Sequence, residues 1–287
     1  MVRYRFFLYA GLLPYLLGAA WAYATTGTID VPIFWSGLGG VVLAVIGVEA
    51  FNEYFDSRMG TDRVFNPDDL PLVSDEILWI GTVAFAGALA IGVYLTIRGG
   101  WPILLFALLG GAAAIFYEAP PIRWSYRGLG EVVIALSYGP WMVLGSLYLH
   151  TRTVSWAALS ASLVPALLIM ALAVVNAIPD FHQDRLVGKR NLVVRIGRQR
   201  AVWLYLALAA GGLSVAVAGV AIGAFPVACL AALLGLPLLV ASGRCALHTF
   251  ETPRLFVPAM RGMVGCYLVA VGLFICGILS QGWRHVA

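Results

Sequence analysis

Charged residues are scarce in this sequence of 287 residues: they make up 11% of the chain, whereas 61% of the residues are hydrophobic. Soluble globular domains carry about 25% charged residues, so the composition excludes an ordinary water-soluble fold. The mean hydropathy of +0.91 points the same way. The chain therefore belongs in a lipid bilayer.

Lysine and paired cysteines are also nearly absent. Of the 18 basic residues only Lys189 is a lysine, and the others are arginines. The cysteines are Cys229, Cys245, Cys266 and Cys276. They lie singly in late apolar segments without a CxxC pair, so no zinc or redox motif is predicted and we expect buried, unreactive thiols. No basic stripe with interleaved aromatic residues is present, which excludes a nucleic-acid partner despite the net charge of +4.

Long apolar runs are what the sequence does contain. A helix needs about 20 apolar residues to cross the hydrocarbon core of a bilayer. Nine such runs are present, at 6–26, 33–55, 77–97, 101–117, 131–150, 156–177, 201–222, 226–243 and 259–281. They lack the alternating pattern of a β-barrel, and unpaired backbone is costly in lipid. We predict an all-α integral membrane protein of about nine transmembrane helices, forming a single domain over residues 1–287.

The distribution of charge predicts the orientation. Nine crossings place the N-terminus and the loops after the even-numbered spans on one side, where fifteen of the basic residues lie, against three on the other side. Cytoplasmic loops are enriched in Arg and Lys, so this side is predicted to be cytoplasmic. Ten of the 14 acidic residues gather there too, in the stretch from Glu49 to Glu76 and at Asp180 and Asp184. We expect the active site on the same side.

Two polar stretches close apolar runs, and each begins with an asparagine followed four residues later by an aspartate. The candidate metal ligands in them are Asn52, Asp56, Asp62, Asn176, Asp180 and Asp184. Residues four apart share a helix face, about 6 Å apart along the axis, so the last three are expected in one line. A carboxylate at the C-terminal end of a helix is disfavoured by the helix dipole, so a cation is needed there. Oxygen ligands of this kind suit Mg²⁺.

Basic residues accompany the acids. The candidate diphosphate ligands are Arg58, Arg123, Arg127 and Lys189. Guanidinium groups bind phosphate through two parallel hydrogen bonds, and lysine binds it as a point charge. Acids for a metal beside bases for an anion predict a site for a metal-bridged diphosphate.

These motifs resemble the UbiA superfamily of intramembrane prenyltransferases. Asn52-x3-Asp56-x5-Asp62 resembles its first aspartate-rich motif, in the spacing of the branch that prenylates 1,4-dihydroxy-2-naphthoate for menaquinone synthesis. Asn176-x3-Asp180-x3-Asp184-Arg-x2-Gly-Lys189 resembles the second motif. Tyr117 and the stretch Tyr126-Arg-Gly-Leu-Gly-Glu131 resemble a third. Pro121 stands where the hydroxybenzoate branch usually has a lysine, which also favours the naphthoate branch.

The resemblance implies a UbiA-type helical bundle and a Mg²⁺-dependent transfer of a polyprenyl group from prenyl diphosphate to an aromatic acceptor, dihydroxynaphthoate or a related quinone precursor. It also implies two Mg²⁺ ions between the aspartate motifs, with Asp56, Asp180 and Tyr117 as catalytic residues and Tyr126 beside the diphosphate. The expected partners are prenyl diphosphate, the acceptor and membrane lipid.

Two other functions fit part of the pattern. A UbiA-type terpene cyclase would ionise the same donor without an acceptor. A cation transporter would use the acids as an ion path, although the spans lack the polar residues that such a path needs on the opposite face. At single positions, Glu118 fits either a loop surface or a polar group near the acceptor. Glu131 fits either a helix cap or a partner of Arg127.

Overall fold

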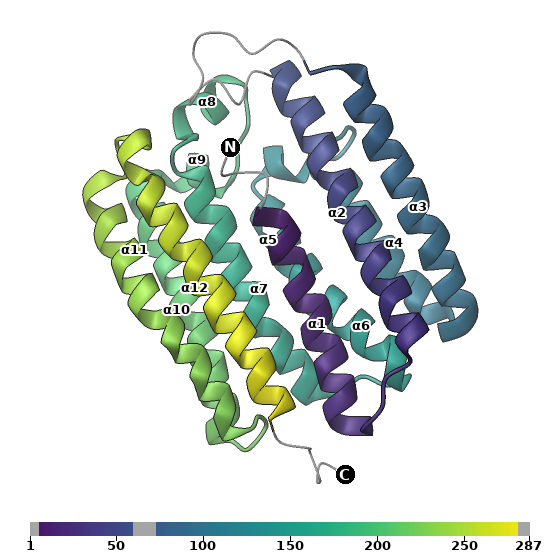
Figure 1. The fold of residues 1–287 in the computed structure, drawn as a ribbon. Coiled ribbons are helices and arrows are strands. Elements are labelled where there is room, and N and C mark those ends of the chain that lie inside the picture. Colours follow the sequence, from purple (N-terminus) through teal and green to yellow (C-terminus); the bar gives the residue numbers. More distant parts are fainter. Residues whose placement is uncertain (1–5, 60–72, 281–287) are drawn as a thin grey trace.

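A computed structural model of the chain describes residues 6–59 and 73–280, and within these ranges it contains helices and no strands (Figure 1). The long helices are α1 (Phe6–Thr26), α2 (Val31–Met59), α3 (Asp75–Gly99), α4 (Trp101–Ile115), α7 (Trp156–Ala177), α10 (Arg198–Ala221), α11 (Leu236–Thr249) and α12 (Pro253–Leu279). The short ones are η2 (Trp124–Arg127), α5 (Gly130–Leu136), η3 (Ser137–Trp141), α6 (Met142–Thr151), α8 (Phe181–Leu186), α9 (Leu192–Ile196) and η4 (Val227–Gly235). The all-α prediction is confirmed.

Each of the nine predicted apolar runs overlaps a helical segment. Among the described residues, seven helical segments are long and apolar enough to cross a membrane, whereas α4, although apolar, has only 15 residues. The count of nine crossings therefore stays a prediction. The first residues of α1 and the last of α12 lie at opposite ends of the bundle (Figure 1).

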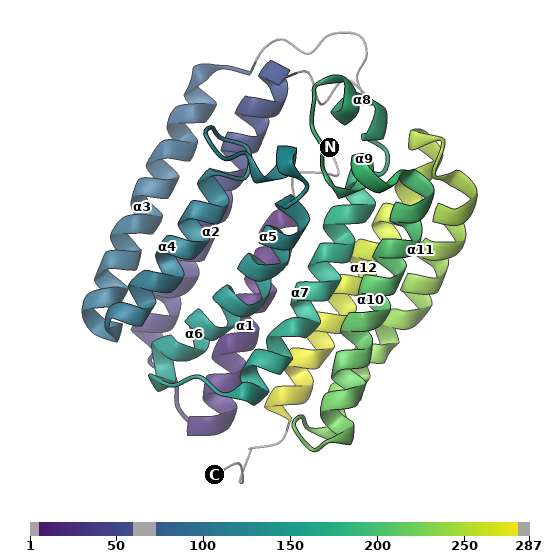
Figure 2. The same cartoon turned by 180° about the vertical axis from the view of Figure 1, so that it is seen from behind.

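The bundle has two halves that differ in packing. We call α7, α10, η4, α11 and α12 the packed half, and α2, α3, α4 and the α5–α6 segment the hollow half. They lie on opposite sides of the molecule with α1 between them (Figures 1 and 2). In the packed half the side chains of Leu168, Ile169 and Leu172 on α7 are fully buried, as are Tyr267 and Phe274 on α12. The main hydrophobic core thus lies in the packed half.

The segment from Gly130 to Thr151 is interrupted in its middle, at Gly139 and Pro140. Proline lacks an N–H and disfavours helical geometry in the residue before it, and Gly139 has the non-helical angles φ −105° and ψ −107°. A Cβ at Gly139 would lie only 2.4 Å from the Cβ of Ala166 on α7. Glycine therefore lets the broken segment lie directly against the packed half.

The prediction of four buried cysteines is only half right. Cys229 and Cys266 are buried, Cys245 is half-buried and Cys276 is exposed. The prediction is wrong for Cys276 because an apolar side chain on the outside of a membrane bundle meets lipid as apolar as itself, so burial is not required.

Candidate active site

A polar cavity of about 120 Å³ lies where α2, α7, α8 and the segment between α4 and α5 meet. Its polar lining consists of Glu49, Asn52, Glu53, Asp56, Tyr117, Glu118, Ser125, Glu131, Asn176, Asp180, Asp184, Lys189 and Asn191. The structure thus brings together five of the six predicted metal ligands, from two stretches more than 100 residues apart in the sequence. The sixth, Asp62, lies outside the described residues.

The second polar stretch does not follow one straight helix, contrary to the expectation of three oxygens in one line. Asn176 lies in the last turn of α7, which ends at Ala177, whereas Asp180 precedes α8 and Asp184 lies within it. Pro179 lies between the two helices, and its ring and missing N–H interrupt a continuous helix. The chain turns here, and the side chains of Asp180 and Asp184 become nearly fully buried, with 2% and 4% exposure.

Asn191 fixes Asp184 in the cavity. Its Nδ2 donates to Asp184 Oδ2 at 2.7 Å, and its Oδ1 accepts the N–H of Val194 at 2.8 Å as the N-cap of α9. The backbone N–H of Lys189 also donates to the Asp184 carbonyl at 2.8 Å, after a turn at Gly188 with φ +79°. The sequence reasoning missed Asn191, although an asparagine before a short apolar run is a helix-start signal.

Lys189 lies among carboxylates inside this cavity. Its Nζ donates to Glu118 Oε1 at 3.0 Å and lies 3.9 Å from Asp56 Oδ1. It also lies 5.7 Å from the centre of the Tyr126 ring. Burial disfavours the ammonium, but the nearby carboxylates of Glu118 and Asp56 outweigh this effect and hold the pKa of Lys189 well above its usual range. Lys189 is therefore a cation.

Glu118 is not a loop-surface residue, since only 4% of it is exposed. Burial raises the pKa of Glu118, and the Lys189 ammonium opposes that rise. Burial likewise raises the pKa of Tyr126 to about 12, so its hydroxyl stays protonated. Of the two readings of Glu131, the cap holds: its Oε1 accepts the N–H of Leu192, the first residue of α9, at 3.0 Å.

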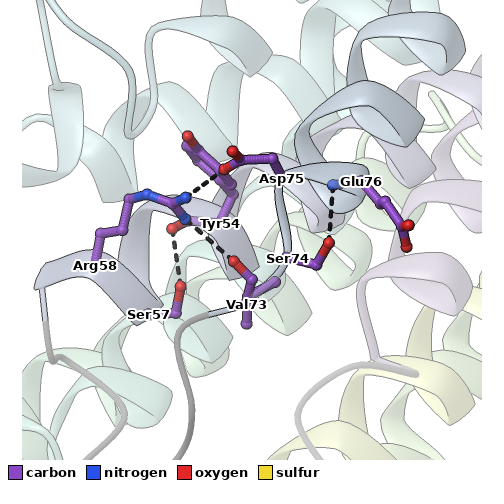
Figure 3. A network of polar contacts seen from close by, with 7 residues as sticks. All are labelled: Tyr54, Ser57, Arg58, Val73, Ser74, Asp75 and Glu76. Carbon is purple, nitrogen blue, oxygen red and sulfur yellow. Dashed lines mark hydrogen bonds and ion pairs between the residues drawn. The ribbon is translucent and has the colours of Figure 1, made fainter.

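The three predicted arginine ligands line neither this cavity nor the apolar one described below, within the part of the chain that the structure covers. Arg58 forms an ion pair with Asp75 and donates to the Val73 carbonyl (Figure 3). Its guanidinium also lies 3.6 Å from the centre of the Tyr54 ring. These contacts tie the end of α2 to the start of α3.

The other two arginines are in the segment between α4 and α5. Arg123 has a left-handed backbone with φ +52°, and its guanidinium lies 5.4 Å from the centre of the Tyr126 ring. Arg127 donates to the Pro121 carbonyl at 3.3 Å, and its own carbonyl accepts from Arg195 at 2.7 Å. Of the four predicted diphosphate-binding cations, the structure places Lys189 among the acids of the polar cavity and the three arginines outside it.

A second cavity, apolar and about 570 Å³ in volume, lies within the hollow half. It is lined by residues of α2, α3, α4 and the α5–α6 segment, among them Phe85, Ala107 and Gly111. Asn52, Tyr117 and Ile134 line both cavities, so the polar one adjoins the apolar one across these three side chains. Tyr117 therefore lies at the junction of the two cavities.

The profile of the UbiA prenyltransferase family matches residues 11–261. The chain belongs to the UbiA prenyltransferase family. It is 26% identical over 206 residues to the 1,4-dihydroxy-2-naphthoate octaprenyltransferase of Bacillus subtilis, a match that covers 70% of this chain and 66% of that protein. It is 29% identical over 282 residues to the enzyme of the same name from Mycobacterium tuberculosis, covering 92% and 89%.

Solved structures share the fold of this UbiA-family chain. A UbiA homologue from Aeropyrum pernix superposes with a TM-score of 0.70 at 18% identity, covering 97% of this chain and 98% of that one. A UbiA homologue from Archaeoglobus fulgidus, solved with GPP and Mg²⁺, superposes with a TM-score of 0.61 at 18% identity, covering 96% and 97%. The predicted membership of the UbiA superfamily is confirmed, and the protein is an integral membrane prenyltransferase.

Proposed function

We propose that the protein transfers a polyprenyl group from a prenyl diphosphate to an aromatic acceptor of the 1,4-dihydroxy-2-naphthoate type, with Mg²⁺ bound at the diphosphate. The observation that carries this proposal is the adjoining pair of cavities. A substrate with an anionic head and a long apolar tail matches a polar, lysine-containing cavity that adjoins a larger apolar one. The naphthoate acceptor rests on the names of the curated relatives.

The residues of the polar cavity fit a magnesium ion. Carboxylate and amide oxygens of Asp56, Asp180, Asp184, Asn52 and Asn176 line it, and these are the hard ligands that Mg²⁺ prefers. Among the described residues, no three acids, histidines or cysteines are grouped tightly enough to enclose a metal by themselves. Such a site suits Mg²⁺, which commonly binds through one or two carboxylates and takes its other ligands from water and substrate phosphate. When bound, the metal would neutralise the charge of the departing diphosphate.

Side chains of the two cavities would then direct the reaction. The bond between the allylic carbon and the diphosphate oxygen breaks, the electron pair leaves with pyrophosphate, and Lys189 stabilises the new negative charge. Tyr117, at the junction of the cavities, presents an aromatic ring near the carbon that becomes positive. The acceptor ring forms the new carbon–carbon bond and loses a proton.

The orientation in the membrane is part of the proposal. The polar cavity lies at the end of the bundle where α2 ends and where α8 and α9 are found (Figure 1). The loops at this end carry most of the basic residues of the chain, which supports a cytoplasmic location. A water-soluble diphosphate head would then enter from the cytoplasm while its tail stays in the bilayer.

The test is a substrate panel. The purified protein is offered prenyl diphosphates of different length with dihydroxynaphthoate, hydroxybenzoate or no acceptor, each with and without Mg²⁺. We expect a prenylated naphthoate product that requires Mg²⁺. A cyclic hydrocarbon formed from the donor alone would show a terpene cyclase instead, and product with hydroxybenzoate alone would reassign the acceptor.

A further inference from the structure

Glu118 and Lys189 form a buried pair that joins two separate parts of the polar cavity. The carboxylate comes from the segment after α4 and the ammonium from the turn after α8, 71 residues apart in the sequence. Their side chains are 4% and 12% exposed. Between the oxygen and the nitrogen the distance is 3.0 Å, whereas Asp56, a predicted metal ligand, is 3.9 Å from the same nitrogen.

The position of Lys189 depends on this pair. A lysine side chain has four carbon atoms in its stem and rotates freely, so its ammonium takes the position that its partners define. The backbone of Lys189 is fixed by the hydrogen bond from its N–H to the Asp184 carbonyl. That hydrogen bond does not determine which carboxylate the ammonium at the end of the side chain contacts. If Glu118 were removed, Asp56 would be the remaining ion-pair partner of Lys189. Lys189 would then neutralise a metal ligand.

We propose that Glu118 is a positioning residue that holds the Lys189 ammonium closer to its own carboxylate, at 3.0 Å, than to that of Asp56, at 3.9 Å, and toward the diphosphate. This inference rests on the proposed function, because it takes the diphosphate as the ligand of the cavity. Glu118 acts through Lys189 and not on the substrate, whose negative charge it would repel.

The experiment measures binding of inorganic pyrophosphate to the full-length protein in detergent, by calorimetry at several Mg²⁺ concentrations. It requires neither an acceptor nor turnover. We compare the wild type with Glu118→Gln, Lys189→Gln and the double variant, and use Glu251→Gln, an exposed glutamate in the turn between α11 and α12, as the matched control. Thermal unfolding of each variant verifies that it is folded.

We expect Glu118→Gln to weaken pyrophosphate binding about tenfold, the effect of one charge-assisted hydrogen bond, and to raise the Mg²⁺ concentration required. In the Lys189→Gln background the same change should have little further effect, because residues that act through one another are not additive. Glu118→Asp, which keeps the charge on a shorter side chain, should fall between the wild type and Glu118→Gln. It also serves as the test variant if Glu118→Gln does not fold.

Three results would overturn the inference. Glu118→Gln could bind pyrophosphate as tightly as the wild type and the control. The fold losses in pyrophosphate affinity of the two single variants could multiply in the double variant, as expected if Glu118 were itself a metal ligand. The wild type could fail to bind pyrophosphate with Mg²⁺. Tight pyrophosphate binding without any prenyl transfer would instead contradict the proposed function and leave this inference standing.

Discussion

The packed half and the hollow half of the bundle differ in how closely their helices pack against one another. In the packed half, Leu168 and Leu172 on α7 are completely buried. In the hollow half, Val83, Leu89 and Leu108 are exposed, and the last two line the apolar cavity. One set of acids in the polar cavity comes from α2 of the hollow half, and the other comes from the stretch that follows α7 of the packed half. The difference indicates that close packing fixes α7, which ends just before Asp180, whereas loose packing leaves room for the tail of the proposed substrate.

The largest effect is expected where the two halves meet. Asp56→Asn on α2 and Asp180→Asn between α7 and α8 should each lower pyrophosphate release by about 10²–10³-fold, because each removes a negative charge from the proposed metal site. The measurement is pyrophosphate release with prenyl diphosphate, Mg²⁺ and acceptor, with Glu251→Gln as control. A loss of activity in only one of the two variants would mean that only one of the two polar stretches holds the metal.

The next effect separates stability from function. Leu172→Ala on α7 should lower the free energy of unfolding by about 2 kcal/mol, the lower end of the range for Leu→Ala changes in protein cores. Moving an apolar side chain from lipid into the bundle gains no hydrophobic free energy, so the variant loses only packing contacts. Leu163→Ala on the same helix, where the side chain is 40% exposed, should cost much less. Unfolding in mixed micelles measures both. Equal losses would remove the distinction between a packed core and a lipid face.

In the hollow half we expect a substitution to change the activity and not the stability. Gly111 lines the apolar cavity, and a Cβ added there meets no atom within 4 Å. Gly111→Phe should therefore fold normally but lower kcat/KM for long prenyl diphosphates by about tenfold more than for short ones, since a bulky ring takes up cavity volume. Gly272→Phe on α12 is the matched control, as its added Cβ also meets nothing within 4 Å. Unchanged chain-length preference in Gly111→Phe would place the tail elsewhere.

The smallest effect is expected at Arg58. Its guanidinium is already paired with Asp75 outside the polar cavity, and exposed pairs of this kind contribute about 0–1 kcal/mol. Arg58→Ala should leave the KM for the donor and the unfolding midpoint nearly unchanged. A large rise in KM, measured beside Lys189→Gln, would restore Arg58 as a diphosphate ligand.

Features that depend on the spacing of nearby residues could be predicted from the sequence. The apolar runs predicted the helices, and the four-residue interval placed Asn52 and Asp56 together on α2, where both line the polar cavity. Features that depend on distant contacts could not be predicted in this way. The pairing of Glu118 with Lys189 spans 71 residues, and the apolar cavity is enclosed by several helices at once. The prediction that Asn176, Asp180 and Asp184 lie in one line failed because it assumed a continuous helix, which Pro179 interrupts.

Asn191 imposes a double requirement on one position of the chain. A helix cap alone accepts serine, threonine, aspartate or asparagine, since each offers an oxygen to the first N–H groups. The second bond, from Nδ2 to Asp184, requires a donor at the same time. Aspartate would keep the cap and place a second negative charge against Asp184, within a buried site. A substitution that preserves the fold of α9 would thus alter the charge balance of the metal site, so local helix propensity alone does not predict which residues are tolerated there.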